Sequence, residues 1–185
     1  MHLIEADKFL SQSLLWEIQR RYFLPGGVAP WQDDVVPSDI SANPTMARAY
    51  RQIVAGYLRD CLRADAAFGF DATRPIYIIE LGAGAGRLAH HFLHDFHDWL
   101  AASPLADLDV VYVMTDFVPA TLDFWRQHPR LQAWVQRGML DFALFDATEP
   151  RPLTLAHAGI ILDADQLINP PILVANYFFD SIPQD

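Results

Sequence analysis

The chain has 185 residues, of which 52% are hydrophobic and 19% are charged. This balance predicts one compact domain with a sizeable core and excludes a disordered or fibrous chain. The formal net charge is -10, from 23 acids against 13 lysines and arginines. Because nucleic acids and anionic membrane surfaces are polyanions, we expect neither as a partner, and a cationic or neutral substrate fits better.

The number of cysteines and the hydropathy of the chain indicate the cellular compartment in which we expect the protein. Cys61 is the single cysteine, so no internal disulfide can form. The sequence shows no basic-then-apolar leader and no apolar run of membrane-spanning length. We therefore expect a cytoplasmic protein.

The first third of the chain predicts two helices and a loop. Apolar residues recur at helical spacing from Phe9 to Phe23, and Pro25-Gly26-Gly27 ends this pattern. A second amphipathic helix is predicted from Asn43-Pro44-Thr45 through Leu62. Its apolar stripe comprises Met46, Ala49, Tyr50, Ile53, Val54, Tyr57, Leu58 and Leu62. Residues 28–44 contain three prolines and little periodicity, which indicates a loop that either lies across a site or only connects the helices.

The centre of the chain reads as a strand, a glycine turn and a helix. Ile76-Tyr77-Ile78-Ile79 is typical of a buried parallel strand, and it ends on an acid, Glu80. Glycines follow at alternate positions, Gly82, Gly84 and Gly86. Such glycines let the backbone approach a ligand closely, and the first N–H groups of the following helix point toward that ligand. The pattern therefore predicts a nucleotide-type site.

The spacing of these glycines separates two classes of cofactor. A dinucleotide fingerprint needs Gly-x-Gly-x-x-Gly, whereas residues 80–86 read Glu-x-Gly-x-Gly-x-Gly, the spacing seen in S-adenosylmethionine (SAM) methyltransferases. SAM is therefore the predicted ligand. The alternatives are NAD or FAD, and a glycine turn that binds nothing.

Two later strands also end on acids. Residues 109–115 predict a buried strand that ends on Asp116, and residues 139–145 predict a third that ends on Asp146-Ala147-Thr148. An acid at a strand tip beside the glycine turn can accept hydrogen bonds from both ribose hydroxyls. The alternative for Asp116 is a helix N-cap or a solvated turn acid.

The remaining segments give predictions of unequal clarity. A helix over residues 120–137 is interrupted at His128-Pro129, because proline disrupts a helix interior. Residues 153–167 show no clean period, and Ile160-Ile161-Leu162 fits either a short strand or a buried turn of helix. Residues 172–179 are strongly apolar and predict a fourth strand.

Four histidines lie on the helix predicted over residues 87–100. The spacing of His90, His91, His94 and His97 is compatible with two imidazoles on one metal ion. However, the helix has no glutamate to act as the general base of a His-Glu-x-x-His hydrolase. A helical histidine cluster without other ligands is usually a solvated face with one member packed, so we predict no metal.

Two segments resemble class I SAM-dependent methyltransferases. They are Glu80-Leu-Gly-Ala-Gly-Ala-Gly86 and Val174-Ala-Asn-Tyr-Phe-Phe-Asp-Ser-Ile-Pro183. The second is similar to the MidA-like group, relatives of the mitochondrial complex I assembly methyltransferase, which reads Asn-Glu-Phe-Phe-Asp-x-x-Pro there. The chain departs at Tyr177, where that group has an acid. Over residues 43–183 the resemblance implies an α/β, Rossmann-like methyltransferase sheet with helices on both faces, preceded by N-terminal helices.

The resemblance also implies how SAM would be held. Glu80 and the turn would surround its methionine half, Asp116 would hold the ribose, and Asp146 with Ala147 would hold the adenine amino group. Asn176 would also contact SAM, beside the transferable methyl group. The turn residues in question are Gly82, Ala83, Gly84 and Gly86.

The implied activity is methyl transfer to a nitrogen of a protein side chain, such as arginine, or to a small molecule. Transfer from a sulfonium is an in-line displacement, so positioning and removal of a proton dominate. Asn176 could accept a hydrogen bond from a substrate N–H, and Asp180 could pair with a guanidinium or ammonium group. Asp180 fits a helix cap equally well. The alternative function is a SAM-binding assembly or interaction module, with Tyr177 marking lost chemistry.

The predicted organisation is a helical segment over residues 1–70 and the first half of a SAM-binding Rossmann-like domain over residues 71–185. A methyltransferase sheet has the order 3-2-1-4-5-7-6, and the strands predicted here supply only its 3-2-1-4 half. Residues 172–179 would then form an apolar edge, which invites pairing with another chain. We therefore expect either a chain incomplete at its carboxyl end or a homodimer through the edge strand.

Overall fold

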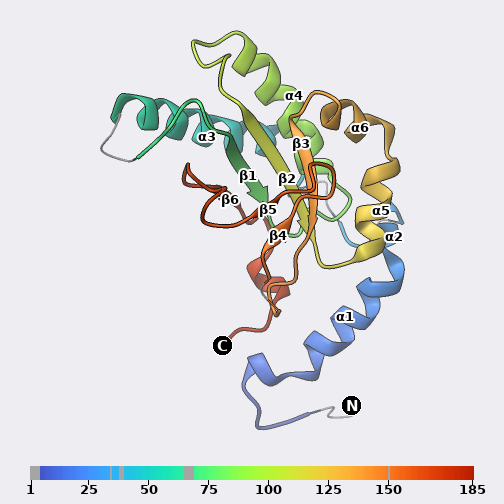
Figure 1. Cartoon of the computed structure of the whole chain (residues 1–185). Helices are drawn as coiled ribbons and strands as arrows, with labels where there is room; N and C mark the ends of the chain where they lie inside the picture. The colour runs from blue at the N-terminus through green and yellow to red at the C-terminus, as the bar shows by residue number, and fades with distance from the viewer. Residues whose placement is uncertain (1–4, 34, 38–39, 65–68, 150) are drawn as a thin grey trace.

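A parallel sheet lies at the centre of the computed structural model, which describes residues 5–33, 35–37, 40–64, 69–149 and 151–185 (Figure 1). Its strands are β1 (Ile76–Glu80), β2 (Val110–Asp116), β3 (Leu140–Leu144) and β6 (Ile172–Val174). They pair in the order β3-β2-β1-β6. The protein is therefore α/β, and the predicted order of these strands is confirmed.

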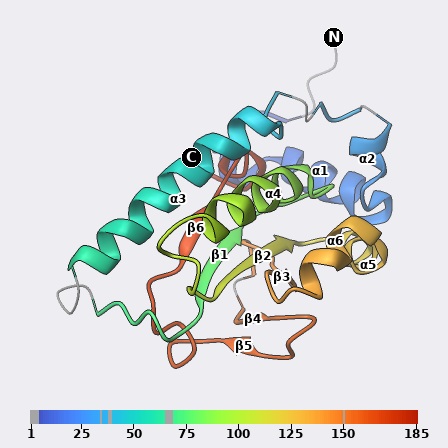
Figure 2. The same cartoon turned by 90° about the horizontal axis from the view of Figure 1, so that it is seen from above.

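Four helices pack against one face of this sheet (Figure 2). They are α3 (Pro44–Ala64), α4 (Arg87–Ala101), α5 (Pro119–Gln127) and α6 (Pro129–Val135). The break between α5 and α6 falls at His128, where a helix was predicted to be interrupted before Pro129. Because α3 shares this core with the strands, the part of the segment 1–70 that forms α3 is packed onto the sheet.

The opposite face of the sheet is covered by the segment 153–167. Here β4 (Leu153–Thr154) and β5 (Ile161–Leu162) form an antiparallel pair, which decides the open question of Ile161 in favour of a strand. Leu155 and Leu162 pack on this face. The expectation of helices on both faces is therefore wrong for the described residues, because a β-hairpin-like segment buries the second apolar face.

The outer edge of β3 is closed by the same segment. The N–H of Ala156 donates to the carbonyl of Phe142 at 2.7 Å. The carboxylate of Asp141, which is buried, accepts from the N–H groups of His157 and Ala158 at 2.8 and 2.9 Å. These bonds satisfy polar groups that an open sheet edge would leave available to another chain.

The amino-terminal segment lies beyond the carboxyl ends of the strands (Figure 1). It forms η1 (Leu10–Gln12), α1 (Leu14–Gly26) and α2 (Ala29–Gln32). The predicted helix therefore exists, but it continues through Pro25 and ends at Gly26, with Gly27 as its C-cap at a φ of 52°. Of the apolar side chains of α1, only Trp16 is buried, because this helix does not lie on either face of the sheet.

Helix α3 begins where the sequence predicts and buries a slightly different face. The side chain of Asn43 accepts from the N–H groups of Thr45 and Met46, both at 3.0 Å, which is the geometry of an N-cap. Val54 and Leu58 are buried as predicted, whereas Ile53 is 69% exposed. No described helix is both long enough and apolar enough to cross a bilayer.

The fourth strand is shorter than predicted. β6 ends at Val174, whose carbonyl accepts the last ladder bond from the N–H of Leu81 at 2.8 Å. The chain then turns at Tyr177, where φ is 52°, and forms the 3₁₀ helix η3 (Phe179–Ser181). A residue with positive φ cannot continue a strand, so the apolar edge spans residues 172–174 rather than 172–179.

We predict that Gly86→Ala destabilises the protein more than Gly138→Ala. Both glycines have positive φ, 77° and 72°, so both substitutions carry about 1 kcal/mol of backbone strain. A Cβ at Gly86 would lie 2.6 Å from the buried Cε of Met114, whereas nothing lies within 4 Å of one at Gly138. The added overpacking raises the expected cost at Gly86 to about 2–4 kcal/mol. Urea unfolding of both variants measures this, and equal losses would contradict it.

Candidate functional site

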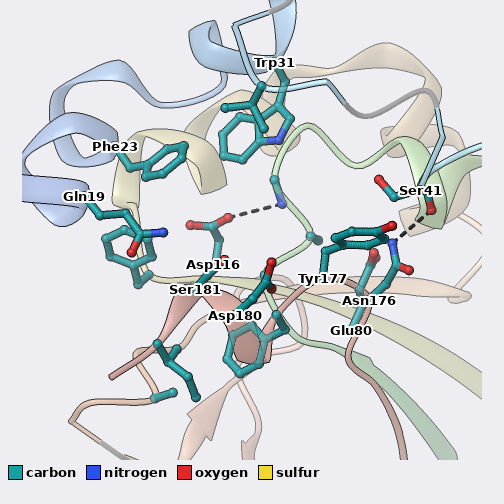
Figure 3. A pocket seen from close by; sticks show the side chains of 18 of the residues that line it. Gln19, Phe23, Trp31, Ser41, Glu80, Asp116, Asn176, Tyr177, Asp180 and Ser181 are labelled. Atoms are coloured by element: carbon teal, nitrogen blue, oxygen red, sulfur yellow. Dashed lines mark hydrogen bonds between the residues drawn. The ribbon is translucent and has the colours of Figure 1, made fainter. Parts of the chain in front are cut away.

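A cavity of about 430 Å³ lies at the carboxyl ends of the strands. The glycine turn, the strand tips, the segment after β6 and the amino-terminal segment all contribute to its wall (Figure 3). The sequence-predicted residues that line it are Glu80, Gly82, Ala83, Gly84, Asp116, Asp146, Ala147, Asn176 and Asp180. The structure therefore brings together residues as far apart in the sequence as Glu80 and Asp180.

Gly86 is the exception among the predicted residues. It does not line the cavity, and the space beside its Cα is filled by Met114, Leu131 and Trp125. Its role is to start α4 with a left-handed backbone, since it is the N-cap of that helix. The geometry therefore does not support the prediction that Gly86 surrounds a ligand, because a side chain at this position would point into the core and not into the cavity.

Glu80 is a buried acid at the tip of β1. Its side chain accepts a hydrogen bond from the hydroxyl of Tyr112 at 3.0 Å, and its residue exposure is only 3%. Burial raises the pKa of Glu80 to about 7. The hydrogen bond from Tyr112 lowers this pKa, and the nearby Asp116 raises it further. The carboxyl group is therefore poised to ionise when a cation enters the cavity.

Asp116 occupies the equivalent place at the tip of β2. One carboxylate oxygen accepts from the N–H of Gly84 at 3.2 Å (Figure 3). The other accepts from the N–H of Val118 at 3.0 Å. Burial raises the pKa of Asp116 to about 6, although these backbone hydrogen bonds lower it. Asp116 is neither solvated nor the N-cap of α5, which is Val118, so the alternative interpretation of this acid is wrong.

The loop before α3 lies across the site. A Cβ at Gly84, whose φ is 53°, would be 3.0 Å from the ring of Trp31, so this indole covers the glycine turn. Phe23 of α1 stacks on Trp31 with ring centroids 5.3 Å apart. Val36 and Ile40 also line the cavity. The open question about residues 28–44 is thus resolved in favour of a roof over the cavity, as far as they are described.

Arg20 of α1 is a site residue that sequence reasoning missed. Its guanidinium donates to the carboxylate of Asp146, and its Cζ lies 4.8 Å from the ring centroid of Phe117. Burial raises the pKa of Asp146, but hydrogen bonds from Arg20 and Thr148 outweigh this effect and leave the pKa below its ordinary value. No local pattern pairs positions 20 and 146, because only the fold brings them together.

Asn176 is held rigidly beside the cavity. Its side-chain NH₂ donates to the carbonyl of Ser41 at 2.9 Å (Figure 3). Its side-chain oxygen accepts from the hydroxyl of Tyr50 at 3.3 Å. Burial, and then the nearby Glu80, raise the pKa of Tyr50. The amide of Asn176 therefore fixes the segment after β6 against α3 and the roof.

The segment after Asn176 contributes exposed residues to the cavity, among them Tyr177 and Asp180. Tyr177 combines positive φ with a side chain that is 67% exposed, which is uncommon for a bulky residue and marks a strained position at the cavity. Asp180 lies inside η3, whose N-cap is Phe178, so the helix-cap interpretation does not hold. Within the described part of the chain, Asp180 makes no hydrogen bond or ion pair and is available to a ligand.

The charges that line the cavity favour a ligand rich in donors. The acids are Glu80, Asp116, Asp146 and Asp180, and the basic residues are Arg20 and Arg87. Because Arg20 is already paired with Asp146, the remaining acids face a space that suits hydroxyl groups or a cation. No group of three or more His, Cys, Asp or Glu side chains among the described residues is arranged to hold a metal ion.

Comparison with known proteins adds no family to these observations. No protein-family model matches the chain, and no match is found among curated proteins. The geometry of the site therefore carries the functional argument.

We predict that Glu80→Gln stabilises the protein at pH 8 and not at pH 4.5. Between the ordinary pKa of 4.5 and the folded pKa of about 7, the unfolded chain has lost the Glu80 proton while the folded chain keeps it, so stability falls as pH rises. Above pH 7, this loss lowers the free energy of unfolding of the parent protein by about 3 kcal/mol. Glutamine keeps an acceptor for Tyr112 without this penalty.

Urea unfolding of both proteins at pH 4.5, 6 and 8 tests this expectation. The stability difference between Glu80→Gln and the parent should grow with pH and level off above pH 7. A difference that stays constant over this range would contradict the raised pKa.

Proposed function

We propose that the chain binds SAM and acts as a SAM-dependent methyltransferase. The observation that carries this proposal is the pair of buried acids, Glu80 and Asp116, at the tips of adjacent parallel strands on either side of a glycine turn. Open α/β sheets bind ligands at the carboxyl ends of their strands, where both acids lie. The order β3-β2-β1-β6 supports identifying the sheet with the 3-2-1-4 half of a methyltransferase sheet.

The lone pairs of Asp116 fit the ribose of such a ligand. A carboxylate has about four acceptor positions, and Asp116 uses two of them for backbone N–H groups. The remaining positions are available to a pair of ribose hydroxyls. In the Glu-x-Gly-x-Gly-x-Gly pattern, Gly84 lines the cavity without a side chain, and this lets the ring of Trp31 lie 3.0 Å from the position a Cβ would take.

Glu80 fits the cationic half of SAM. Its pKa of about 7 means that it is near half ionised in the ligand-free protein at neutral pH. An ammonium or sulfonium group nearby would favour the ionised form and would be stabilised by it. At the other end of the cavity, Asp146 and Ala147 would contact the base, with Arg20 sharing the Asp146 carboxylate.

SAM supplies an electrophilic methyl group, and the residues of this chain would position the acceptor. Asp180 is the exposed, unpaired carboxylate at the cavity wall and would pair with a guanidinium or ammonium group. Asn176 would act mainly by position, because both ends of its amide already have partners. We therefore propose a nitrogen of a protein side chain, arginine among them, or of a small molecule as the acceptor.

A second function is favoured by the segment after β6. Tyr177 replaces the acid of the resembling group, and its exposed ring lies at the cavity beside Asn176 (Figure 3). A SAM-binding module that serves assembly or interaction would keep Glu80 and Asp116 and would not need an acid at Tyr177. This alternative has the same SAM site as the methyltransferase and differs from it only because no methyl group is transferred.

We predict that Asp116→Asn weakens SAM binding about tenfold to a hundredfold. The charge-assisted hydrogen bonds to the ribose would lose about 1.5–3 kcal/mol, while asparagine keeps the size of the side chain and one of its two acceptor oxygens. Asp123→Asn on α5 is the matched control, since this exposed acid pairs with Arg126 and with no other described residue. Isothermal titration with SAM and with S-adenosylhomocysteine measures both. NADH should not displace SAM, and tight competition by NADH would favour the dinucleotide alternative.

We predict that Asp180→Asn lowers methyl transfer while leaving SAM affinity close to that of the parent. Loss of one ion pair with a cationic acceptor costs about 1.5–3 kcal/mol, so kcat/KM should fall at least tenfold. The assay follows labelled methyl groups from SAM to arginine-containing peptides and to a panel of small amines. If SAM binds and no acceptor is methylated, the binding-module alternative is favoured.

A further inference from the structure

A second hollow lies between α4 and α6 and shares no lining residue with the cavity described above. Its volume is about 320 Å³. The residues that line it are His90, His94, Arg130, Ala133, Trp134 and Arg137. The sequence marks the histidines as a cluster, but it gives no sign that two arginines from α6 and its end join them.

The charge of this hollow is opposite to that of the whole chain. Its lining contains two arginines and two histidines and no acid, in a protein with a net charge of -10. Neither Arg130 nor Arg137 forms an ion pair within the described part of the chain. Other arginines, such as Arg51 and Arg126, are paired with aspartates. The two guanidinium groups are therefore available for a ligand.

His90 provides an independent observation at the same place. Its Nδ1 atom is buried and has no hydrogen-bond partner among the described residues. Buried polar atoms in proteins are nearly always hydrogen-bonded, so a ligand in the hollow that bonds to Nδ1 of His90 would satisfy this atom. Burial lowers the pKa of His90, and the nearby His94, His91, Arg130 and His128 lower it further.

Trp134 holds the basic side chains in place. This buried indole contacts His94 edge to face at a centroid distance of 5.1 Å, and the guanidinium of Arg137 lies 4.8 Å from its ring centroid. His90 contacts His94 at 4.9 Å between ring centroids. Donors that are already oriented lose less freedom when they bind a ligand, so this arrangement favours binding.

We propose that the hollow binds a phosphate monoester. Guanidinium groups match the geometry of phosphate oxygens and bind them through paired N–H donors, and imidazole N–H groups add further donors. The hollow is larger than a single oxyanion, so the phosphate would be carried on a larger group, either a small metabolite or a phosphorylated side chain. Because salt screens charges beyond about 8 Å, the local basic groups outweigh the distant acids of the chain.

The test is an NMR titration of the full chain at pH 7.5 and 150 mM salt, followed at the imidazole C–H signals. The probes are glycerol 3-phosphate, a phosphoserine peptide and inorganic phosphate. The signals of His90 and His94 should shift and saturate, whereas those of His157, which lies on the opposite face in the exposed turn before β5, should not move. Tighter binding of the peptide would identify a phosphorylated protein as the source, and tighter binding of glycerol 3-phosphate a metabolite.

Variants decide whether the named residues form the site. Arg130→Gln and Arg137→Gln should each weaken the binding of glycerol 3-phosphate at least tenfold, with SAM binding unchanged. Arg126→Gln, another exposed arginine on the neighbouring helix, should have no effect. Arg137→Lys keeps the charge without the paired donors and should give an intermediate affinity. The absence of saturable shifts with every probe, or equal affinity in all variants, would overturn the proposal.

Discussion

The glycine turn between β1 and α4 depends on a set of hydrogen bonds that tie its backbone to the neighbouring strand and helix. The N–H of Ala83 donates to the carbonyl of Thr115 at 2.8 Å, and the N–H of Gly84 donates to Asp116 at 3.2 Å. The indole N–H of Trp125 donates to the carbonyl of Gly84 at 2.9 Å. The turn therefore cannot move without disturbing β2 and α5. This constraint fixes where the cavity lies and which side of the turn faces it.

The cavity concentrates features that reduce the stability of the fold. Glu80 and Asp116 are buried acids whose pKa values are raised, and Tyr177 has a backbone conformation that few bulky residues adopt. Each is unfavourable in isolation, by an amount of order 1–3 kcal/mol. Proteins keep such features where function requires them, and the rest of the chain compensates. The coincidence of all three at one cavity is the main physical reason to treat it as the functional site.

The parts of the structure that were predictable depend on local patterns. The strand before Glu80 and the strand before Asp116 are continuous apolar runs, and their acids meet because the carboxyl ends of parallel strands lie at one edge. The order of the strands was instead predicted from the resemblance to class I SAM-dependent methyltransferases. In contrast, the contact of Trp31 with Gly84 and the pair of Arg20 with Asp146 join distant segments, and no periodicity encodes them. The length of β6 was overestimated because apolar composition does not reveal positive φ at Tyr177.

The roof of the cavity is attached differently from the rest of the fold. Helix α1 buries only Trp16, and it is tied to the strand ends by the pair of Arg20 with Asp146. A segment with few buried apolar contacts opens at a lower free energy than the core. The strands and α4 are fixed by the central core, so the acids and the glycine turn keep their positions when the roof moves. Helix α1 is therefore held less firmly than the strands that carry Glu80 and Asp116.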